Sequence, residues 1–451
     1  MPEQAAGQPA STLPDKALLD KDKDVTARVQ KTRRAARALA RLSGHDRNHI
    51  LITAADLIKS RSAEILGANR MDCDAAAAGN VAPVLAKRLK TDEAGVKEMA
   101  VRVRDVAALD DPLGHVQATT ELDDGLVLQK VPCPLGVIAV IFESRPDVVP
   151  QVGSLAIKTG NGLVLKGGVE ARLTNRVLAA IWRDALAAHD PAIAESVCLL
   201  EERAEIMQVL QMDREIDLVV PRGSSEFVNF VFKNSRIPVM GHGSGVCHIY
   251  VDKAADLKAA IAVILDSKTQ YPAACNSVEK VLVHDEVARR FLPELVAALQ
   301  AAGVEVRGCE RTKQICADLN VIPATEEDWH TEYCDLKLTI KAVRNLNEAI
   351  EHINHYGSRH TECILTQDNI TAERFLDEVD AASVFQNAST RFADGFRYGL
   401  GAEIGISNSK LHARGPVGME GLLTYKYRLR GSGQVVTEYA QGKRSFKHKK
   451  L

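Results

Sequence analysis

The sequence predicts an α/β fold with parallel sheets, and three observations lead to that class. Continuous apolar runs of strand length occur at residues 136–141, 163–166 and 216–220, as in strands that are covered on both faces. Helical stretches such as residues 173–188 lie between these runs, which is the order of βαβ units. A chain of 451 residues is also too long for one ordinary core, so two or three domains are expected.

The N-terminal quarter is predicted to be mostly helical. Residues 1–24 mix Pro, Gln, Lys and Asp without an apolar core, and we interpret them as a disordered leader. Residues 25–107 are rich in Ala, Arg, Leu and Glu, with apolar residues at helical spacing in segments such as 49–58. The sequence Asp-Pro-Leu-Gly at residues 111–114 ends this region.

Strands and helices alternate through the rest of the chain. Residues 126–131 are typical of an edge or arm strand that precedes the first apolar run. A second α/β block is predicted from about residue 259 to 414, with a strand at 278–283 and helices at 286–301 and 342–354.

The C-terminal end is predicted to be a strand followed by a basic tail. Residues 425–430 alternate in polarity, which favours a strand. Residues 443–450 are strongly basic. We expect a solvated terminus there, with polyanion binding as the alternative.

Composition excludes several classes of protein. The formal net charge of −2, from 57 basic and 59 acidic residues, gives no sign of a nucleic-acid or membrane partner. No apolar stretch approaches the ~20 residues that span a bilayer, and no secretory or transit signal precedes residue 25, so a cytoplasmic location is expected. The nine cysteines include no C-x-x-C pair, which argues against a disulfide framework and a structural zinc site. No metal is predicted.

Three glycine-rich stretches suggest phosphate binding, namely residues 165–168, 221–225 and 240–245. Backbone N–H groups at a helix start suit phosphate oxygens, and glycine lets the backbone come close. None of the stretches fits a known dinucleotide or P-loop pattern, so plain tight turns are the alternative. Lys166, at a strand end, could pair with a ribose hydroxyl or a 2′-phosphate, although a solvated lysine is the default.

Residues 270–277, with the sequence QYPAACNS, form the most suggestive segment for catalysis. They join a predicted helix end to the strand at 278–283, so backbone donors around Cys275 can face a ligand. A thiolate needs a positive field at neutral pH, and the neighbours Asn276 and Ser277 offer only dipoles. Most cysteines are packed as small hydrophobes. The residues alone therefore favour Cys275 only slightly over the other eight.

Three further segments concentrate polar groups. Residues 143–147 place charges at the end of the most apolar strand, where a ligand site and a solvated loop are equally favoured. Residues 387–405 carry Arg391 and Arg397, which could clamp a carboxylate or phosphate, with surface ion pairs as the alternative. Residues 355–362 contain two histidines whose spacing does not match a helical metal motif, so a helix end is favoured.

Taken together, these segments resemble a known family, the gamma-glutamyl phosphate reductases of the aldehyde dehydrogenase superfamily. The resemblance covers residues 25–430. It is carried by VPCPLGVI with FESRP at 131–146, VMGHGSGVCH at 239–248, YPAACN at 271–276 and EAIEHINHYGSRHTE at 348–362. Four such segments in the right order make chance similarity remote.

The resemblance implies a fold and a division of the chain. The fold would be aldehyde dehydrogenase-like, with two Rossmann-like α/β domains and a small β oligomerisation arm. Residues 25–258 would bind NADPH and carry the arm near 118–132, and residues 259–415 would be the catalytic domain. Residues 416–451 would supply an oligomerisation strand and the basic tail. This strand and the arm would pair between subunits of a dimer or tetramer.

The resemblance also implies a reaction of proline biosynthesis, in which L-glutamyl 5-phosphate and NADPH give L-glutamate 5-semialdehyde, phosphate and NADP+. Cys275 would attack the acyl phosphate and form a thioester that hydride then reduces. Ser144 and the backbone N–H of Cys275 are the candidate oxyanion donors. A glutamate 5-kinase is a candidate partner that would deliver the acyl phosphate.

Binding roles follow by the same analogy. Lys166 would bind the adenosine ribose or its 2′-phosphate, and Gly223 and Ser224 would lie by the pyrophosphate. The residues expected to bind the substrate's carboxylate and amine are Arg145, Arg391 and Glu403.

Two alternatives to the reductase remain. One is a hydrolytic NAD(P)-dependent aldehyde dehydrogenase of the same fold. Hydrolytic members carry a glutamate that activates water in a segment like Glu-Leu-Gly-Gly, whereas residues 240–243 read Met-Gly-His-Gly here, and this difference favours the reductase. The other is a catalytically silent scaffold, which the intact motifs argue against.

Overall fold

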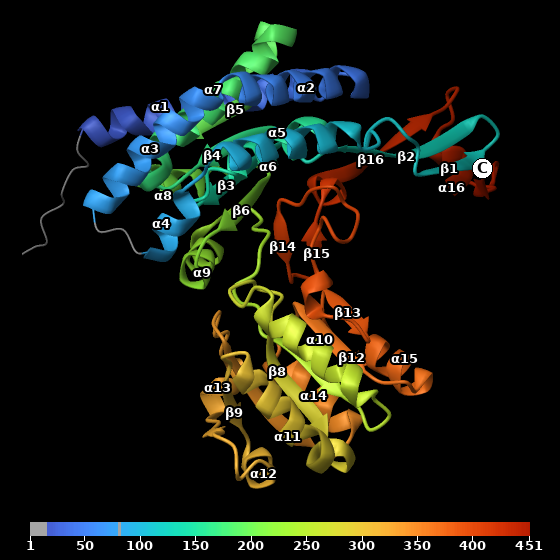
Figure 1. Cartoon of the computed structure of the whole chain (residues 1–451). Helices are drawn as coiled ribbons and strands as arrows, with labels where there is room; N and C mark the ends of the chain where they lie inside the picture. Colours follow the sequence, from blue (N-terminus) through green and yellow to red (C-terminus); the bar gives the residue numbers. More distant parts are fainter. Residues whose placement is uncertain (1–15, 80–82) are drawn as a thin grey trace, which may run out of the picture.

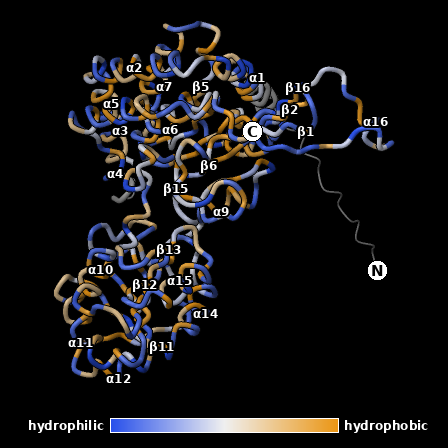
Figure 2. Tube along the Cα trace, turned by 90° about the vertical axis from the view of Figure 1, so that its right-hand side faces the viewer, coloured by the Kyte–Doolittle hydropathy of each residue, from blue (hydrophilic) through white to orange (hydrophobic). Residues whose placement is uncertain are grey.

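Two α/β domains and a projecting β arm make up the molecule (Figure 1). The structure is a computed structural model that describes residues 16–79 and 83–451. Residues 1–15 of the predicted leader lie outside this range. The helix α1 (Lys16–Leu39) includes the other nine leader residues, 16–24. A view turned by 90° shows the same two domains one above the other, with the arm extending from the upper one (Figure 2).

The first domain is built on a four-stranded parallel sheet in the order β5-β4-β3-β6. Its strands are β3 (Val137–Phe142), β4 (Gly162–Lys166), β5 (Val197–Leu200) and β6 (Leu218–Arg222). Successive residues of β3 enter different cores, with Ile138 and Val140 in one and Val137 and Ala139 in the other. This two-sided burial explains why the strand is apolar at every position.

Helices cover both faces of this sheet. One face carries α2 (Gly44–Ser60), α5 (Glu93–Ala108), α6 (Val148–Lys158) and α7 (Arg172–His189). The other face carries α1 and α9 (Ser225–Asn234). The remaining helices of this part are α3 (Ser62–Ala78), α4 (Pro83–Leu89), α8 (Glu205–Val209) and the 3-10 turns η1 (Val169–Ala171) and η2 (Pro191–Ser196). Helices therefore dominate the described part of 25–107, as predicted.

The second domain contains a seven-stranded parallel sheet in the order β10-β9-β11-β8-β7-β12-β13. The strands are β7 (Cys247–Val251), β8 (Val278–His284), β9 (Glu305–Gly308), β10 (Ile322–Pro323), β11 (Lys337–Val343), β12 (Thr361–Leu365) and β13 (Ser383–Gln386). The helices are α10 (Leu257–Thr269), α11 (Asp285–Ala301), α12 (Glu310–Ile315), α13 (Glu326–His330), α14 (Leu346–Tyr356), α15 (Asn369–Glu378) and the 3-10 turn η3 (Thr390–Phe392).

The chain changes domain earlier, and returns earlier, than the boundaries at 259 and 415 that the resemblance implied. Strand β7 lies between β8 and β12 in the second sheet, so the crossing lies before Cys247. The return is marked by Ile404, Val417 and Leu422, which are buried in the core of the first domain. The returning segment forms β14 (Gly405–Ser407), β15 (Gly415–Val417) and the turn η4 (Met419–Leu422).

The arm is a four-stranded antiparallel sheet in the order β16-β2-β1-β17. Its strands are β1 (Ala118–Asp123), β2 (Leu126–Pro134), β16 (Leu423–Arg430) and β17 (Lys449–Lys450). The two segments expected to pair between subunits thus pair with each other in one chain. Strand β2 was expected to be an edge or arm strand, and it lies inside the arm, with β16 paired to it from Val127 to Pro134.

The basic tail is exposed to solvent, as expected, but it is not frayed, because it folds back onto the arm. After α16 (Val436–Ala440), the rings of Tyr439, Phe446 and His448 stack in sequence. Lys447 forms ion pairs with Asp123 and Asp124, and β17 pairs with β1. Local acidic partners therefore neutralise part of the tail's charge.

Two buried polar contacts stabilise the second domain. The Lys268 ammonium at the end of α10 lies 3.0 Å from the Glu279 carboxylate on β8, and both side chains are buried. Lys341 lies 3.2 Å from Nδ1 of His352, which is 4% exposed. Burial, helped by repulsion from neighbouring cations, lowers the pKa of His352 to about 2, so this imidazole is neutral.

Within residues 16–79 and 83–451, none of the helices combines the length and apolar character needed to cross a membrane.

Candidate active site

Cys275 lies on the short loop between the end of α10 at Thr269 and the start of β8 at Val278, as the sequence predicted. Its side chain is half-buried. The loop packs closely against the segment that crosses between the domains. A side chain at Gly245 would place its Cβ 2.0 Å from the carbonyl oxygen of Cys275. The thiol of Cys247 also donates to that oxygen over 3.2 Å. Glycine at 245 therefore permits the contact that holds the Cys275 backbone.

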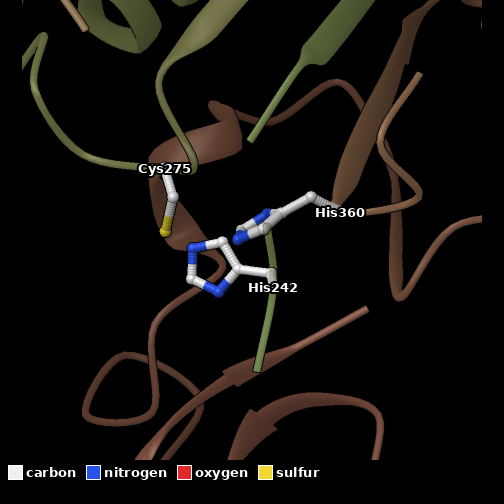
Figure 3. A group of neighbouring side chains, drawn as sticks. All are labelled: His242, Cys275 and His360. Atoms are coloured by element: carbon white, nitrogen blue, oxygen red, sulfur yellow. The ribbon is translucent and has the colours of Figure 1, made fainter. Parts of the chain in front are cut away.

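Two imidazoles face the Cys275 sulfur (Figure 3). His242 comes from the crossing segment, and His360 comes from the residue just before β12. One nitrogen of each ring and the Sγ of Cys275 all lie within 4.8 Å of one another. The two rings meet edge to face with their centroids 5.1 Å apart. Three segments that are distant in sequence thus meet at one point.

Each ring is oriented through its Nδ1 atom. Nδ1 of His242 lies 2.9 Å from the carbonyl oxygen of Ile406, and since a carbonyl only accepts, Nδ1 carries the proton. Nδ1 of His360 lies 2.8 Å from the hydroxyl of Thr361. The Nε2 atom of His360 is buried and has no hydrogen-bond partner among the described residues.

Two guanidinium groups supply the positive field that the local sequence around Cys275 lacks. Arg222 ends β6, and its electrostatic neighbours include Cys275. Burial, together with the nearby Arg145, lowers the pKa of Arg222 to about 10, which leaves it charged at neutral pH. Arg391 is 9% exposed, interacts with Cys275 and donates its Nε–H to Gln270 over 2.9 Å. A nearby cation is the condition that favours a thiolate.

Ser144 is placed differently from its expected role. Its side chain is fully buried, and its backbone has a positive φ of 38°. Both its hydroxyl and its backbone N–H donate to one oxygen of Glu170, at 2.6 and 2.7 Å. In this arrangement the hydroxyl is committed to Glu170, so Ser144 would have to exchange that partner before it could bind a substrate oxygen.

The expected cofactor residues gather at one edge of the first sheet. The chain adds β4 and β5 on one side of β3 and then crosses to the other side of β3 to form β6. The carboxyl ends of β3 and β6 therefore flank a topological switch point. In the sheet register, Lys166 lies beside Ile141. Lys166 is buried, its Nζ lies 2.6 Å from the carbonyl of Gly167, and burial lowers its pKa. Carboxyl ends of parallel strands at a switch point are where nucleotides bind in such sheets.

Gly223 and Ser224 lie at the same edge, between β6 and α9. Ser224 caps α9, because its hydroxyl accepts from the backbone N–H of Phe227 at 3.3 Å. Its own N–H donates to the Glu143 carboxylate at 3.1 Å. A Cβ at Gly223 would lie 2.6 Å from that carboxylate, so a larger residue there would require the Glu143 side chain to move.

The expected substrate residues lie around the two guanidinium groups. Arg145 pairs with Asp147 at 3.4 Å on a partly exposed loop after β3. Glu403 accepts from the backbone N–H of Gly395 at 2.8 Å, and its electrostatic neighbours include Arg222 and His242. Burial raises the pKa of Glu403.

Sequence reasoning missed His242, His360 and Arg222. Each stands in a segment that the sequence singled out, but these segments are separated by up to 138 residues. The spacing test for metal ligands compares neighbours in sequence, so it could not find ligands on three separate segments. The sequence offered one signal for these residues: each is a polar side chain in a segment that is rich in glycine or lies at the end of a predicted helix or strand.

Comparisons with known proteins show which family the chain is similar to. The profile of the aldehyde dehydrogenase family matches residues 11–315. A gamma-glutamyl phosphate reductase of Cyanothece sp. is 52% identical over 429 residues, which cover 95% of this chain and 98% of that protein. The corresponding reductase of Pelotomaculum thermopropionicum is 50% identical, again over 95% of this chain and 98% of that protein.

Solved structures show the same likeness. The crystal structure of the gamma-glutamyl phosphate reductase of Thermotoga maritima superposes with a TM-score of 0.89 at 42% identity, covering 91% of this chain and 99% of that one. A glyceraldehyde-3-phosphate dehydrogenase of Methanocaldococcus jannaschii, solved with NADP, has a TM-score of 0.64 at 18% identity. It covers 91% of this chain and 95% of that one, and it supports the fold alone.

Proposed function

The chain belongs to the gamma-glutamyl phosphate reductases of the aldehyde dehydrogenase family, and we propose that it reduces L-glutamyl 5-phosphate with NADPH. The products are L-glutamate 5-semialdehyde and phosphate, and the step belongs to proline biosynthesis. That the protein is an enzyme follows from its membership of this family. The cofactor, the covalent route and the roles of single residues are the proposal.

The observation that carries the proposal is the Cys275 thiol between two guanidinium groups and two imidazoles. The sulfur attacks the acyl carbon, the bond from that carbon to the phosphate oxygen breaks, and phosphate leaves with the electron pair. The thiol proton moves to Nε2 of His242, which is free to accept because Nδ1 donates to a carbonyl. Arg222 and Arg391 stabilise the leaving phosphate.

The thioester oxygen needs donors when it becomes an oxyanion. The backbone N–H of Cys275 is the proposed first donor. Ser144 is the proposed second donor, and it acts only after its hydroxyl leaves Glu170.

The residues at the sheet edge fit a dinucleotide. A buried lysine at the end of β4, a side-chain-free approach at Gly223 and a Ser224-capped helix start together suit ribose and pyrophosphate oxygens. We propose that Lys166 binds the adenosine ribose or its 2′-phosphate and that Gly223 and Ser224 bind the pyrophosphate. NADPH, when bound, supplies the hydride that reduces the thioester.

The remaining charged groups would bind the amino-acid end of the substrate. Arg145 and Arg391 are proposed to hold the α-carboxylate, and Glu403 the ammonium group. Arg391 would then serve the carboxylate and the phosphate in turn, a point that its substitution by lysine can test, because a bidentate contact is lost while the charge is kept.

A water-activating carboxylate is replaced here by an imidazole. The segment that carries a glutamate in hydrolytic relatives contains His242, whose ring faces the Cys275 sulfur. Because this imidazole can itself act as a general base, the phosphate dependence of the reaction, and not this residue, separates reduction of the thioester from hydrolysis.

The decisive experiment runs the reaction in reverse, with glutamate semialdehyde and NADP+, with and without phosphate. We expect NADP+ reduction only when phosphate is present, and turnover without phosphate would support the hydrolytic alternative. Cys275→Ala should abolish turnover, whereas Cys334→Ala, at an exposed cysteine, should leave it unchanged. Full activity in Cys275→Ala would show that the nucleophile is misassigned.

The arm supports a proposal about assembly. Strand β16 is the outer strand of the arm sheet, and its Tyr425, Tyr427 and Leu429 side chains are 49–61% exposed. We propose that these residues meet another copy of the chain, giving a homo-oligomer of two or four subunits. The cytoplasmic location and the glutamate 5-kinase partner stay predictions from the sequence.

A further inference from the structure

The cluster of Cys275, His242 and His360 has the composition of a metal site. Two imidazole nitrogens and one sulfur lie within 4.8 Å of one another, and they come from a loop, a crossing segment and a strand start. We propose that these three side chains bind a soft divalent cation such as Zn2+, and that the bound cation switches the enzyme off by occupying the thiol. No metal was predicted from the sequence, because the three ligands lie on segments that are distant in the chain.

The first argument is the orientation of the imidazoles. Histidines that bind metals usually donate their other ring N–H to a carbonyl or similar acceptor, which fixes the tautomer. His242 does this through Nδ1 and the Ile406 carbonyl at 2.9 Å, so Nε2 presents its lone pair. When Nδ1 of His360 donates to the Thr361 hydroxyl at 2.8 Å, its Nε2 also presents a lone pair.

The second argument is an unpartnered buried atom. His360 is 1% exposed, and its Nε2 atom has no hydrogen-bond partner among the described residues. A buried polar nitrogen without a partner is costly, because folding removes its hydrogen bond to water and supplies none in return. A cation held between this nitrogen, the sulfur and His242 would satisfy it.

The third argument is the chemistry of the ligand set. One thiolate and two imidazoles suit Zn2+ in a tetrahedral site whose fourth position is open to water. Binding forms a metal–sulfur bond and releases the thiol proton to solvent, with no change in oxidation state. Mg2+ prefers oxygen ligands and would not compete.

The neighbouring charges indicate that such binding is reversible. Arg222 and Arg391 both interact with Cys275, and their positive charges oppose a dication at the same place. The affinity should therefore be weaker than that of a structural zinc site. A phosphate-bearing substrate, which these guanidinium groups attract, should displace the cation or be displaced by it.

The inhibitory part of this inference rests on the proposed role of Cys275 as nucleophile, whereas cation binding itself does not. Binding is therefore measured separately from turnover. Co2+ is the first probe, because a tetrahedral thiolate site gives a charge-transfer absorption that reports the metal–sulfur bond directly. Zn2+ is the second probe and should displace Co2+, since it binds such sites more tightly.

Titration of the full chain with Co2+ should give this absorption with one equivalent bound per chain. Cys275→Ser should abolish it, and His242→Gln or His360→Gln should weaken binding at least tenfold, as loss of one ligand requires. The matched controls are Cys334→Ser and His355→Gln, an exposed cysteine and an exposed histidine outside the cluster, and both should bind Co2+ like the wild type. An absorption that persists in Cys275→Ser, or none in the wild type, would overturn the site.

A measurement on the wild type alone guards against variants that fail to fold. Iodoacetamide should alkylate Cys275, and Zn2+ should slow this labelling at least tenfold while Mg2+ does not. Labelling of Cys334 should not change. Equal protection of both cysteines, or no protection of Cys275, would refute the inference. If Co2+ binds but Cys275→Ala keeps full turnover, the cation site stands and the proposed catalytic role of Cys275 fails. If Cys275→Ala loses turnover but the wild type binds no Co2+, the catalytic role stands and the cation site fails.

Discussion

Substitution of Gly245 by alanine is the sharpest test of how the Cys275 loop is held. The added Cβ would lie 2.0 Å from the carbonyl oxygen of Cys275 and 2.7 Å from its Cα. Non-bonded heavy atoms are most stable about 3.5–4.0 Å apart. The two backbones must therefore separate by roughly 1.5 Å, since neither contact involves a flexible side chain. Such a shift moves the nucleophile relative to its surroundings.

The expected effect is large on catalysis and moderate on stability. Misplacing a reacting group by 1 Å can cost about 10²-fold in rate, so kcat should fall by about that factor or more. Overpacking typically costs about 1–3 kcal/mol, so the folded state should survive. The KM for phosphate should change less than kcat, because the guanidinium groups are not on the displaced segment.

The assay is phosphate-dependent NADP+ reduction, followed together with thermal unfolding. Gly241→Ala is the matched control, since its Cβ would meet Pro221 at an ordinary 3.6 Å in the same segment. It should keep kcat within about twofold, a change of less than about 0.5 kcal/mol in activation free energy. Wild-type kcat in Gly245→Ala, or an equal loss in Gly241→Ala, would show that the close approach does not position Cys275.

The remaining predictions concern stability and assembly. Lys268→Met should lower the free energy of unfolding by about 3–5 kcal/mol in urea titrations, because it leaves the buried Glu279 carboxylate without its ion-pair partner. The control Lys337→Met, at an exposed pair, should lower it by under about 1 kcal/mol. His352 has a folded pKa of about 2, below its unfolded value of about 6.5. Its contribution to the free energy of unfolding is therefore fully present above pH 6.5 and is lost as the pH falls. By pH 5 the free energy of unfolding should have fallen by about 2 kcal/mol through this group. If His352→Gln shows the same slope of unfolding free energy against pH as the wild type, the assignment to His352 is refuted. Leu429→Lys should weaken the proposed contact of β16 with another copy of the chain, so the molecular mass measured by light scattering should fall.

Sequence patterns predicted the elements whose local rule and final environment agree. Strand β3 is apolar at every position because both of its faces are buried, and that rule was visible in the sequence. The position of Cys275 between α10 and β8 was visible for the same reason, since helix and strand signals flank it closely.

Other features depend on contacts between distant segments. Strand β7 follows a long irregular segment, and only its neighbours β8 and β12 place it in the second sheet. The ordering of the exposed tail was not predicted because its partners, Asp123 and Asp124, lie more than 300 residues away in sequence. Ser144 was placed by analogy, and the structure adds Glu170, which no local pattern connects to it.

The same pattern applies to the site. The field around Cys275 comes from Arg222 and Arg391, each on a different domain segment. A search near Cys275 in sequence finds only dipoles, so the charge near the thiol is a property of the assembled domains.

The return of the chain to the first domain sets an order of events during synthesis. Strand β2 pairs with β16, and Pro134 and Leu423 lie 289 positions apart in the sequence. At about 5–20 residues per second a ribosome needs roughly 15–60 s to make that stretch. The second domain, which is continuous in the chain, can therefore finish folding first, while the first domain waits with one face of its core still open. A nascent chain halted within residues 400–420 should thus be the form that chaperones bind most strongly.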